Sequence, residues 1–226
     1  RLFAEHGDKI AAVISEPVQG AGGVIPPPDG YLDGLRRLCT DNGALLIFDE
    51  VISGFGRTGE WFAAQTYKVT PDLITFAKGV TSGYLPLSGV IISRELADEL
   101  ENDDYGKLMH GYTYSGHPTA AAAALANISV IESRGLLQEA HRIGEKMEAG
   151  LKALAGDGMI KSYRGIGGIW ACELGWSGLE ASHAMVDKGV VCRGIGEALA
   201  FCPPLIITDS EIGTIFDRLD EVLREH

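Results

Sequence analysis

Residues 44–50 read ALLIFDE, an unbroken apolar run that ends in the carboxylates of Asp49 and Glu50. A short apolar run without alternation is typical of a strand buried on both faces of a parallel sheet. Upstream, residues 31–42 predict a helix and residues 9–15 (KIAAVIS) predict a second buried strand. The order strand, helix, strand predicts parallel pairing through a right-handed crossover. We therefore expect an α/β fold with a mostly parallel sheet.

The remaining elements follow from periodicity and turn residues. Residues 51–59 (VISGFGRTG) predict a glycine-punctuated loop, and the pattern changes after Gly156 to short strands mixed with helices. We expect two domains, one formed by residues 1–135 and a smaller α+β domain formed by residues 136–226. The other predicted elements are a helical turn at 60–66, strands at 72–77, 87–93, 160–164, 169–174, 190–193 and 200–202, helices at 94–101, 119–133, 136–155, 179–188 and 210–224, and a loop at 103–118.

Composition restricts the class of protein. The net charge of −12 argues against a nucleic-acid partner, which clustered Lys and Arg would attract. No apolar run approaches the roughly 18 residues that a membrane-spanning helix needs. No signal peptide is visible, although the chain begins with Arg1 rather than Met. We expect a cytoplasmic enzyme with no membrane association and with buried, reduced thiols at its four cysteines.

A carboxylate and an amine follow consecutive predicted strands. Asp49 ends the strand at 44–49, and Lys78 comes directly after the strand at 72–77. The carboxyl ends of such strands are where open α/β sheets bind ligands. Pyridoxal phosphate chemistry needs this pair, because the amine forms a Schiff base with the cofactor aldehyde while the carboxylate keeps the pyridine nitrogen protonated. Taken singly, Asp49 is more often a helix cap or an ion-pair partner and Lys78 an exposed loop lysine.

Other site motifs are weak or absent. The glycine clusters at residues 20–23 and 54–59 could hold an anion, but neither matches the dinucleotide or P-loop pattern. The six histidines lack metal-ligand spacing and no HExxH occurs, so no metal site is predicted. No GxSxG occurs, which disfavours a serine hydrolase.

Four motifs occur in order along the chain: residues 16–20 (EPVQG), 46–59 (LIFDEVISGFGRTG), 71–79 (PDLITFAKG) and 110–118 (HGYTYSGHP). Together they resemble the class III aminotransferases, the ω-transaminase group of the fold-type-I pyridoxal phosphate enzymes. The resemblance extends through residues 202–208 (CPPLIIT) near the end of the chain. It implies a three-layer α/β/α large domain, of which residues 1–135 are the C-terminal part, followed by a C-terminal small domain.

The resemblance implies roles for three residues around the cofactor ring. Asp49 matches the partner of the pyridine nitrogen, and Lys78 matches the lysine that forms the Schiff base. Val51 matches the aliphatic residue that packs on one face of the ring. Asp49 and Lys78 are therefore the expected catalytic pair, with Lys78 as the general base and acid that moves the proton from Cα.

Three further residues are expected to contact the phosphate or the substrate. Thr113 matches the threonine that reaches the phosphate, in this family usually across a dimer interface into the neighbouring subunit's site. Arg193 is similar to the mobile arginine that binds a substrate carboxylate and swings away for an apolar amine. Trp61 lies near the entrance in related enzymes.

Two departures from relatives narrow the expected substrates. Ornithine- and γ-aminobutyrate-type relatives often carry Gln where this chain has Ile52, and ornithine-type relatives carry a gating glutamate where it has Ala21 and Gly22. Both differences favour a ping-pong transamination from an ω-amino acid or an amine to a keto acid, with pyruvate as the acceptor. A class III aminomutase, a decarboxylase and a non-catalytic fragment of the same fold are the alternatives.

The chain is short for this family. Relatives are roughly twice as long, and their N-terminal half would supply the first sheet strands and a phosphate loop at a helix N-terminus. We therefore expect the C-terminal half of a homodimeric or tetrameric enzyme whose active sites are shared. A sheet with an exposed edge would make residues 1–226 unstable and inactive by themselves.

Overall fold

The computed structural model describes residues 1–102 and 108–226. By its internal contacts the chain divides into two compact units. Unit 1 comprises Arg1–Pro17, Pro28–Phe55 and Phe62–Ser133, whereas unit 2 comprises Val18–Pro27, Gly56–Trp61 and Arg134–His226. The predicted division at residue 135 concerns the domains of the complete enzyme and stays a prediction.

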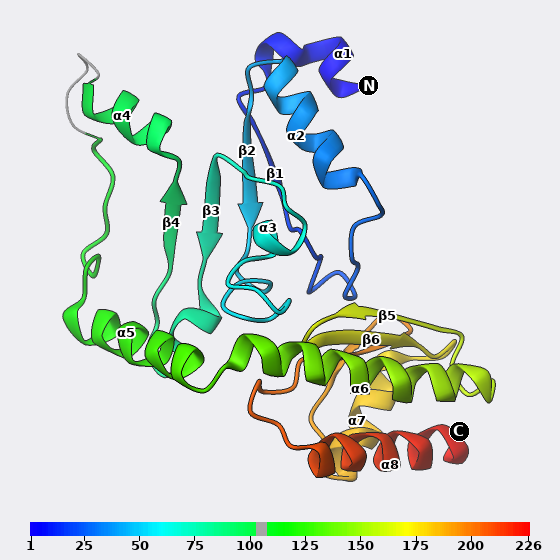
Figure 1. The fold of residues 1–226 in the computed structure, drawn as a ribbon. Helices are drawn as coiled ribbons and strands as arrows, with labels where there is room; N and C mark the ends of the chain where they lie inside the picture. The colour runs from blue at the N-terminus through cyan, green and yellow to red at the C-terminus, as the bar shows by residue number, and fades with distance from the viewer. Residues whose placement is uncertain (103–107) are drawn as a thin grey trace. The chain divides into compact units, whose positions relative to one another are not determined.

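A four-stranded sheet with the order β1-β2-β3-β4 forms the centre of unit 1 (Figure 1). Its strands are β1 (Ala12–Ser15), β2 (Leu45–Asp49), β3 (Leu73–Phe76) and β4 (Gly89–Ile92). The first three strands are parallel, and β4 is antiparallel to β3. The predicted parallel pairing of the first two strands is confirmed, and the mixed, mostly parallel sheet agrees with the predicted α/β class.

The apolar core of unit 1 lies between this sheet and α2 (Tyr31–Asp41). The helix ends at Asp41, Asn42 caps it, and Gly43 follows in the left-handed conformation at φ +65°. Glycine adopts that conformation without the steric cost of a Cβ atom. The core residues are Leu32, Cys39, Ala44, Leu46, Phe48 and Val69.

Short helices complete the first half of unit 1. They are α1 (Leu2–His6), the 3₁₀ turn η1 (Gly7–Lys9) and α3 (Ala63–Thr66). The sequence did not predict α1, because five residues with no buried side chain leave no apolar periodicity to detect.

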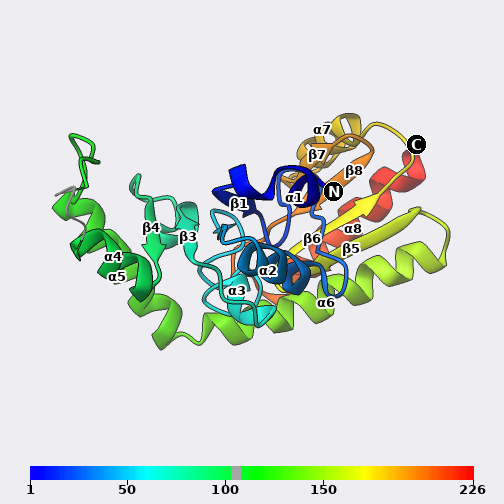
Figure 2. The same cartoon turned by 90° about the horizontal axis from the view of Figure 1, so that it is seen from above.

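Two helices lie at opposite ends of β4 (Figures 1 and 2). They are α4 (Arg94–Asn102) and α5 (Pro118–Ser133), and α5 packs against the 3₁₀ turn η2 (Lys78–Thr81) that follows β3. Residues 103–107 of the predicted loop lie outside the described residues. Residues 108–117 form no helix or strand, as predicted for this loop.

The outer strands of unit 1 carry exposed apolar side chains. Among the described residues β1 and β4 each pair with one strand only. Ile14 on β1 is 62% exposed and Val90 on β4 is 55% exposed. This arrangement is the exposed sheet edge that the sequence predicted.

Unit 2 is an α+β structure with an antiparallel sheet of order β5-β6-β8-β7. Its strands are β5 (Ser162–Ile166), β6 (Ile169–Glu173), β7 (Arg193–Ile195) and β8 (Ala198–Phe201). Three helices cover one face, namely α6 (Leu136–Gly156), α7 (Gly178–Asp187) and α8 (Asp209–Glu225). The core between them includes Trp170, Cys172, Leu199 and Phe201 from the strands and Ile143, Met147, Met185 and Leu219 from the helices.

Some predicted details of unit 2 are wrong. The strand predicted at residues 190–193 is β7, which begins only at Arg193, because the backbone N–H of Val190 instead closes the end of α7 on the carbonyl of Met185. β5 begins two residues later than predicted. Buried thiols were predicted at all four cysteines, but only Cys39 and Cys172 are buried, whereas Cys202 is exposed.

In the described part of the chain, no single helix has both the length and the apolar composition to cross a membrane. The helices α5 and α6 satisfy these criteria only when they are taken together.

Candidate active site

Asp49 is the last residue of β2 and continues a regular parallel ladder. It lies opposite Thr75 on β3, and the next backbone N–H, that of Glu50, donates to the carbonyl of Thr75 at 2.9 Å. The Oδ1 atom of Asp49 accepts a hydrogen bond from the N–H of Val51 at 3.1 Å. The acid is therefore placed by ordinary strand pairing, at the carboxyl end where such sheets bind ligands.

The neighbouring carboxylate of Glu50 is completely buried and holds the chain that follows. Its Oε2 atom accepts hydrogen bonds from Ser53 Oγ at 3.0 Å and from the N–H of Ala63 at 2.5 Å. Its Oε1 atom accepts from the N–H of Ala64 at 2.8 Å. Burial raises the pKa of this carboxyl group, and the three donors oppose that rise. Glu50 thus fastens the start of α3 to the end of β2.

Lys78 occupies a strained position at the start of η2. Its φ is +43°, in the left-handed region that residues with a Cβ atom rarely adopt, at a cost of about 1–3 kcal/mol. Ser82, which ends η2, is also left-handed at φ +52°. The Lys78 side chain is exposed and makes no ion pair among the described residues. Strained backbone of this kind persists only where the surrounding structure holds it.

Packing against Phe55 and a hydrogen bond of Thr81 stabilise the η2 turn. A Cβ atom on Gly79 would lie 3.0 Å from Cβ of Phe55, so a larger residue would require a small shift of Phe55. The ring of Phe55 packs edge to face on Phe76, at a centroid distance of 5.6 Å. Val80 and Thr81 are buried, and Thr81 Oγ1 donates to the carbonyl of Leu85 at 2.6 Å.

Asp49 and Lys78 are brought together by the register of β2 and β3. Since Asp49 pairs with Thr75, and Lys78 is three residues further along, the two Cα atoms lie within about 11 Å. The lysine side chain can span most of this distance. The structure therefore brings together the acid and the amine that the sequence singled out.

Unsatisfied polar groups at this place fit a bound pyridoxal phosphate. The Thr75 hydroxyl is buried and has no hydrogen-bond partner among the described residues. Asp49 accepts one backbone hydrogen bond, which leaves capacity for a protonated ring nitrogen. The exposed amine of Lys78 can reach an aldehyde. A buried hydroxyl without a partner is costly, so it indicates a group that the chain alone does not provide.

The glycines of residues 54–59 are explained by packing rather than by anion binding. A Cβ atom on Gly54 would lie 2.9 Å from the carbonyl oxygen of Glu50. Gly59 has φ +97°, and a Cβ atom there would collide with the ring of His141. Arg57, between them, donates to the carbonyls of Gly168 and Pro203 at 2.8 and 2.6 Å. The loop is a structural connector.

Arg193 lies in a row of paired residues across the sheet of unit 2. It pairs with Ala200, which pairs with Ala171, which pairs with Arg164. Directly paired residues of antiparallel strands point to the same face, so two arginines flank two alanines on the face that the helices leave uncovered. Arg193 is exposed and makes no ion pair among the described residues, as a mobile carboxylate ligand requires.

Arg164, at the other end of this row, already makes a hydrogen bond and an ion pair. Its Nε donates to the carbonyl of Gly23 at 2.8 Å, and its guanidinium pairs with Glu173 at 2.8 Å. The loop Val18–Pro27 therefore lies over the face from which Arg193 projects. Ala21 and Gly22 of this loop carry no carboxylate that could neutralise Arg193.

The other predicted residues occupy separate places. Val51 is half-buried next to Asp49. Thr113 is exposed in a tight turn closed by a hydrogen bond from the N–H of Ser115 to the carbonyl of Tyr112, at 2.9 Å. No hydrogen bond joins Thr113 to Asp49 or Lys78 within the described residues. Trp61 is half-buried and belongs, like Arg193, to unit 2.

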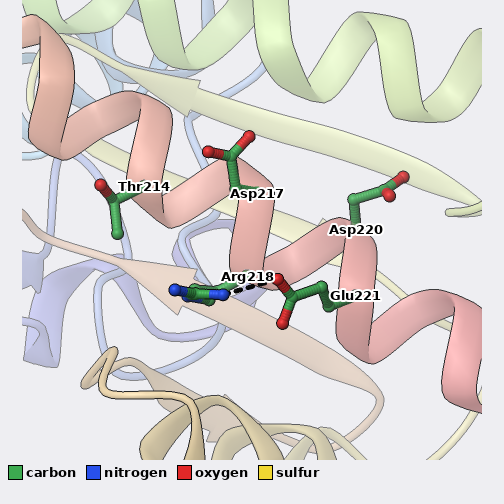
Figure 3. Close-up of a pocket in the computed structure, with 5 residues that line it drawn as sticks. All are labelled: Thr214, Asp217, Arg218, Asp220 and Glu221. Atoms are coloured by element: carbon green, nitrogen blue, oxygen red, sulfur yellow. Dashed lines mark hydrogen bonds and ion pairs between the residues drawn. The ribbon is translucent and has the colours of Figure 1, made fainter.

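Two hollows of the described surface do not coincide with these residues. One of about 440 Å³ lies on α8 and is lined by the polar side chains Thr214, Asp217, Arg218, Asp220 and Glu221 (Figure 3). Arg218 is already paired with Glu221 at 2.6 Å. The other, of about 630 Å³, is an apolar groove between α4 and the opposite end of the sheet from Asp49.

Sequence reasoning missed the parts played by Glu50 and Arg164. Glu50 was visible as the second carboxylate after an apolar run, but adjacency to Asp49 does not reveal a buried side chain. Arg164 stands in a predicted strand, and an arginine on a strand that otherwise faces a core was a usable signal.

Comparisons with known proteins agree with this geometry. The family model described as "Aminotransferase class-III" matches residues 1–223. A diaminobutyrate–2-oxoglutarate transaminase of Halomonas elongata is 39% identical, over 99% of this chain and 52% of that protein. A putrescine–pyruvate aminotransferase of Pseudomonas aeruginosa is 39% identical, over 91% of this chain and 47% of that protein.

The fold matches solved structures equally well. A crystal structure of an (S)-enantioselective omega-transaminase from Thermomicrobium roseum superposes with a TM-score of 0.94 at 38% identity. It covers 99% of this chain and 53% of that structure. The chain thus spans about half the length of the relatives it matches.

Proposed function

The chain belongs to the class III aminotransferase family, and from this membership we propose that it carries the acid and the amine of a pyridoxal phosphate-dependent transaminase. The observation that carries the proposal is the placement of Asp49 and Lys78 at the carboxyl ends of adjacent parallel strands. Thr75 pairs with Asp49, and its buried hydroxyl has no hydrogen-bond partner among the described residues, which supports a bound group at this place.

Each residue has a physical task in amino transfer. Bound pyridoxal phosphate would supply a conjugated ring that spreads the charge released when the Cα–H bond of the substrate breaks. Asp49 keeps a proton on the ring nitrogen by charge pairing. The amine of Lys78, once displaced by the substrate amine, would take the proton from the substrate Cα and deliver it to the former aldehyde carbon of the cofactor. Val51, beside Asp49, packs on one face of the ring.

Arg193 is proposed to recognise the carboxylate of the keto acid. A guanidinium can donate two parallel hydrogen bonds to a carboxylate, which fixes its orientation. Arg193 has no ion pair to give up among the described residues, and the loop over its face carries no glutamate at residues 21–22. These observations favour pyruvate as the acceptor and an ω-amino acid or an amine as the donor. Trp61 is assigned to the substrate entrance on family grounds alone.

We propose that the enzyme is a homodimer, or a tetramer built of such dimers, in which Thr113 completes the neighbouring subunit's phosphate site. Apolar side chains surround this exposed turn, with Met109 94% exposed and Tyr112 76% exposed. Such exposed apolar side chains favour a protein interface. Location in the cytoplasm is also proposed, on charge and composition alone.

Complementation between variants tests the shared site. Lys78→Ala and Thr113→Ala subunits of the full-length protein are each expected to bind the cofactor poorly. If Thr113 acts across the interface, a mixed dimer regains one intact site, with Lys78 from one subunit and Thr113 from the other. Restored cofactor binding supports the proposal, whereas no restoration places Thr113 in its own subunit's site or outside any site.

Amino transfer itself is tested with the full-length protein and added pyridoxal phosphate. Formation of alanine from pyruvate and an amine donor is expected for the native protein and not for Lys78→Ala. Arg193→Ala should lower the use of pyruvate much more than the use of a neutral amine donor. Arg37→Ala is the matched control, because it removes another exposed arginine that makes no ion pair among the described residues. If Arg193→Ala lowered activity with the amine donor and with pyruvate equally, Arg193 would not be the residue that binds the carboxylate.

A further inference from the structure

A single amide interrupts the buried face of α5. Residues Ala120, Ala124, Asn127 and Ile131 follow helical spacing, and the two alanines and the isoleucine are buried. Asn127 is half-buried and is the polar member of this stripe. An amide on an apolar helix face loses water contacts on folding, so its retention needs hydrogen bonds in return.

Those hydrogen bonds go to the turn that carries Lys78. Asn127 Nδ2 donates to the carbonyl of Gly79 at 2.8 Å and to the carbonyl of Val80 at 3.2 Å. Gly79 and Val80 are the two residues directly after Lys78. α5 packs against η2, so the amide ties the turn to a helix of four turns (Figure 1).

The anchored turn is the strained one. Lys78 at φ +43° and Ser82 at φ +52° delimit η2 on either side of the two carbonyls. Without an external restraint the backbone of Lys78 would relax toward negative φ, and its amine would leave the position opposite Asp49. Within the turn, the N–H of Val80 donates to the carbonyl of Ala77 and the N–H of Ser82 to the carbonyl of Gly79. Among the described residues, the other side-chain hydrogen bond of the turn is that of Thr81, further from the lysine.

We propose that Asn127 is a positioning residue, which holds the η2 backbone so that the Lys78 amine meets the cofactor beside Asp49. The proposal rests on the proposed function, because it assumes that Lys78 is the attachment point. Asn127 acts through Lys78 and touches neither cofactor nor substrate.

A double-mutant cycle in the full-length protein separates this role from a general structural one. Asn127→Asp keeps the shape of the side chain but turns both donors into acceptors that face two carbonyls. With Lys78 present, we expect it to weaken pyridoxal phosphate binding about tenfold or more, and to slow growth of the absorbance band of the lysine–cofactor bond by a similar factor. In the Lys78→Ala background, the same change should alter cofactor affinity by less than about twofold.

Two further variants distinguish a specific effect of Asn127 from a general loss of folding. Asn42 also donates its Nδ2 to one carbonyl, that of Leu38 at 2.8 Å, at the opposite end of the parallel strands. Asn42→Asp should leave the cofactor band unchanged. If Asn127→Asp does not fold, Asn127→Ala is measured instead, with a smaller expected effect in the same direction.

The outcomes are distinct. Equal losses of cofactor affinity in both lysine backgrounds, or no change with either Asn127 variant, would overturn the positioning role. If the native protein forms no lysine–cofactor band at all, the proposed function fails, whatever Asn127 does.

Discussion

The two strand ends that carry Asp49 and Lys78 are built in different ways. Asp49 closes a regular strand, and the ladder to β3 continues past it through the N–H of Glu50. Lys78 stands just after its strand, in a left-handed conformation. Asn127 donates a hydrogen bond to its turn, and Phe55 packs against Gly79 of the same turn. The acid is placed by backbone pairing, whereas the amine is placed by side chains from distant parts of the chain.

The difference has a chemical reason. An acid that only holds a proton on a ring nitrogen can stay in one place throughout a reaction. An amine that is displaced by the substrate and then moves a proton needs a precise position and freedom at its end. A strained turn held from outside provides both, but it depends on contacts that one substitution can remove.

The largest expected effect separates the two groups directly. Lys78→Ala should abolish the lysine–cofactor absorbance band and lower turnover by about 10²–10⁴-fold, because the proton carrier is lost. Asp49→Asn should keep the band, since the amine is untouched, and lower turnover by about 10²–10³-fold. Absorbance spectra and steady-state rates on the full-length protein measure both. A band that persists in Lys78→Ala would remove the assignment of the lysine.

A smaller effect, on stability, is expected at Glu50, whose side chain anchors the segment that follows Asp49. Glu50→Ala leaves the N–H groups of Ala63 and Ala64 without their acceptor and should lower the free energy of unfolding by about 1–3 kcal/mol. Denaturant unfolding measures it. Thr214→Ala on the exposed face of α8 is a control, with an expected change within about 0.5 kcal/mol. A loss in Glu50→Ala no larger than in this control would contradict the anchoring role.

The pH dependence of stability should also report Glu50. Burial raises the pKa of its carboxyl group in the folded state, so the folded protein binds the proton more tightly than the unfolded chain. The contribution of Glu50 to stability is therefore fully present below its unfolded pKa and is lost as pH rises through the folded pKa. The unfolding free energy of Glu50→Gln, measured over the same pH range, should lack this decline. Parallel pH profiles for the two proteins would refute the raised pKa.

The smallest expected effect compares two glycines of the Lys78 turn. Gly83→Ala introduces a Cβ at φ +77° into open space and should cost about 1 kcal/mol of stability through backbone strain alone. Gly79→Ala crowds Phe55 instead and should, in addition, slow cofactor attachment at Lys78. Thermal unfolding and stopped-flow absorbance distinguish them. The same attachment rate in both variants would show that Phe55 does not help to place the lysine.

The regular parts of this site could be predicted from sequence. The apolar run that ends in Asp49 and the segment that precedes Lys78 both form strands as predicted, because continuous apolar patterns report burial locally. The parallel pairing of β1 with β2 followed from the helix between them, whereas the pairing of β2 with β3, which sets Asp49 opposite Thr75, was not predicted. The family resemblance then supplied the roles of the remaining site residues, which stay predictions.

The irregular parts could not be predicted. The left-handed φ of Lys78 depends on contacts with residues far away in sequence, and no local pattern signals them. The glycines of residues 54–59 suggested anion binding, but they pack against Glu50 and His141. Asn127 was one polar residue in an alanine-rich helix. Its place on the stripe of residues 120, 124 and 131 was the signal that could have revealed it.

Amide hydrogen exchange of the full-length protein tests the central contrast most directly. In Asn127→Asp, we expect the N–H groups of Val80 and Ser82 in η2 to exchange about tenfold faster or more, since the turn loses its external anchor. The N–H of Glu50, bonded to the carbonyl of Thr75 at the end of β2, should keep its native rate. Equal acceleration at both strand ends, or unchanged exchange in η2, would contradict the account.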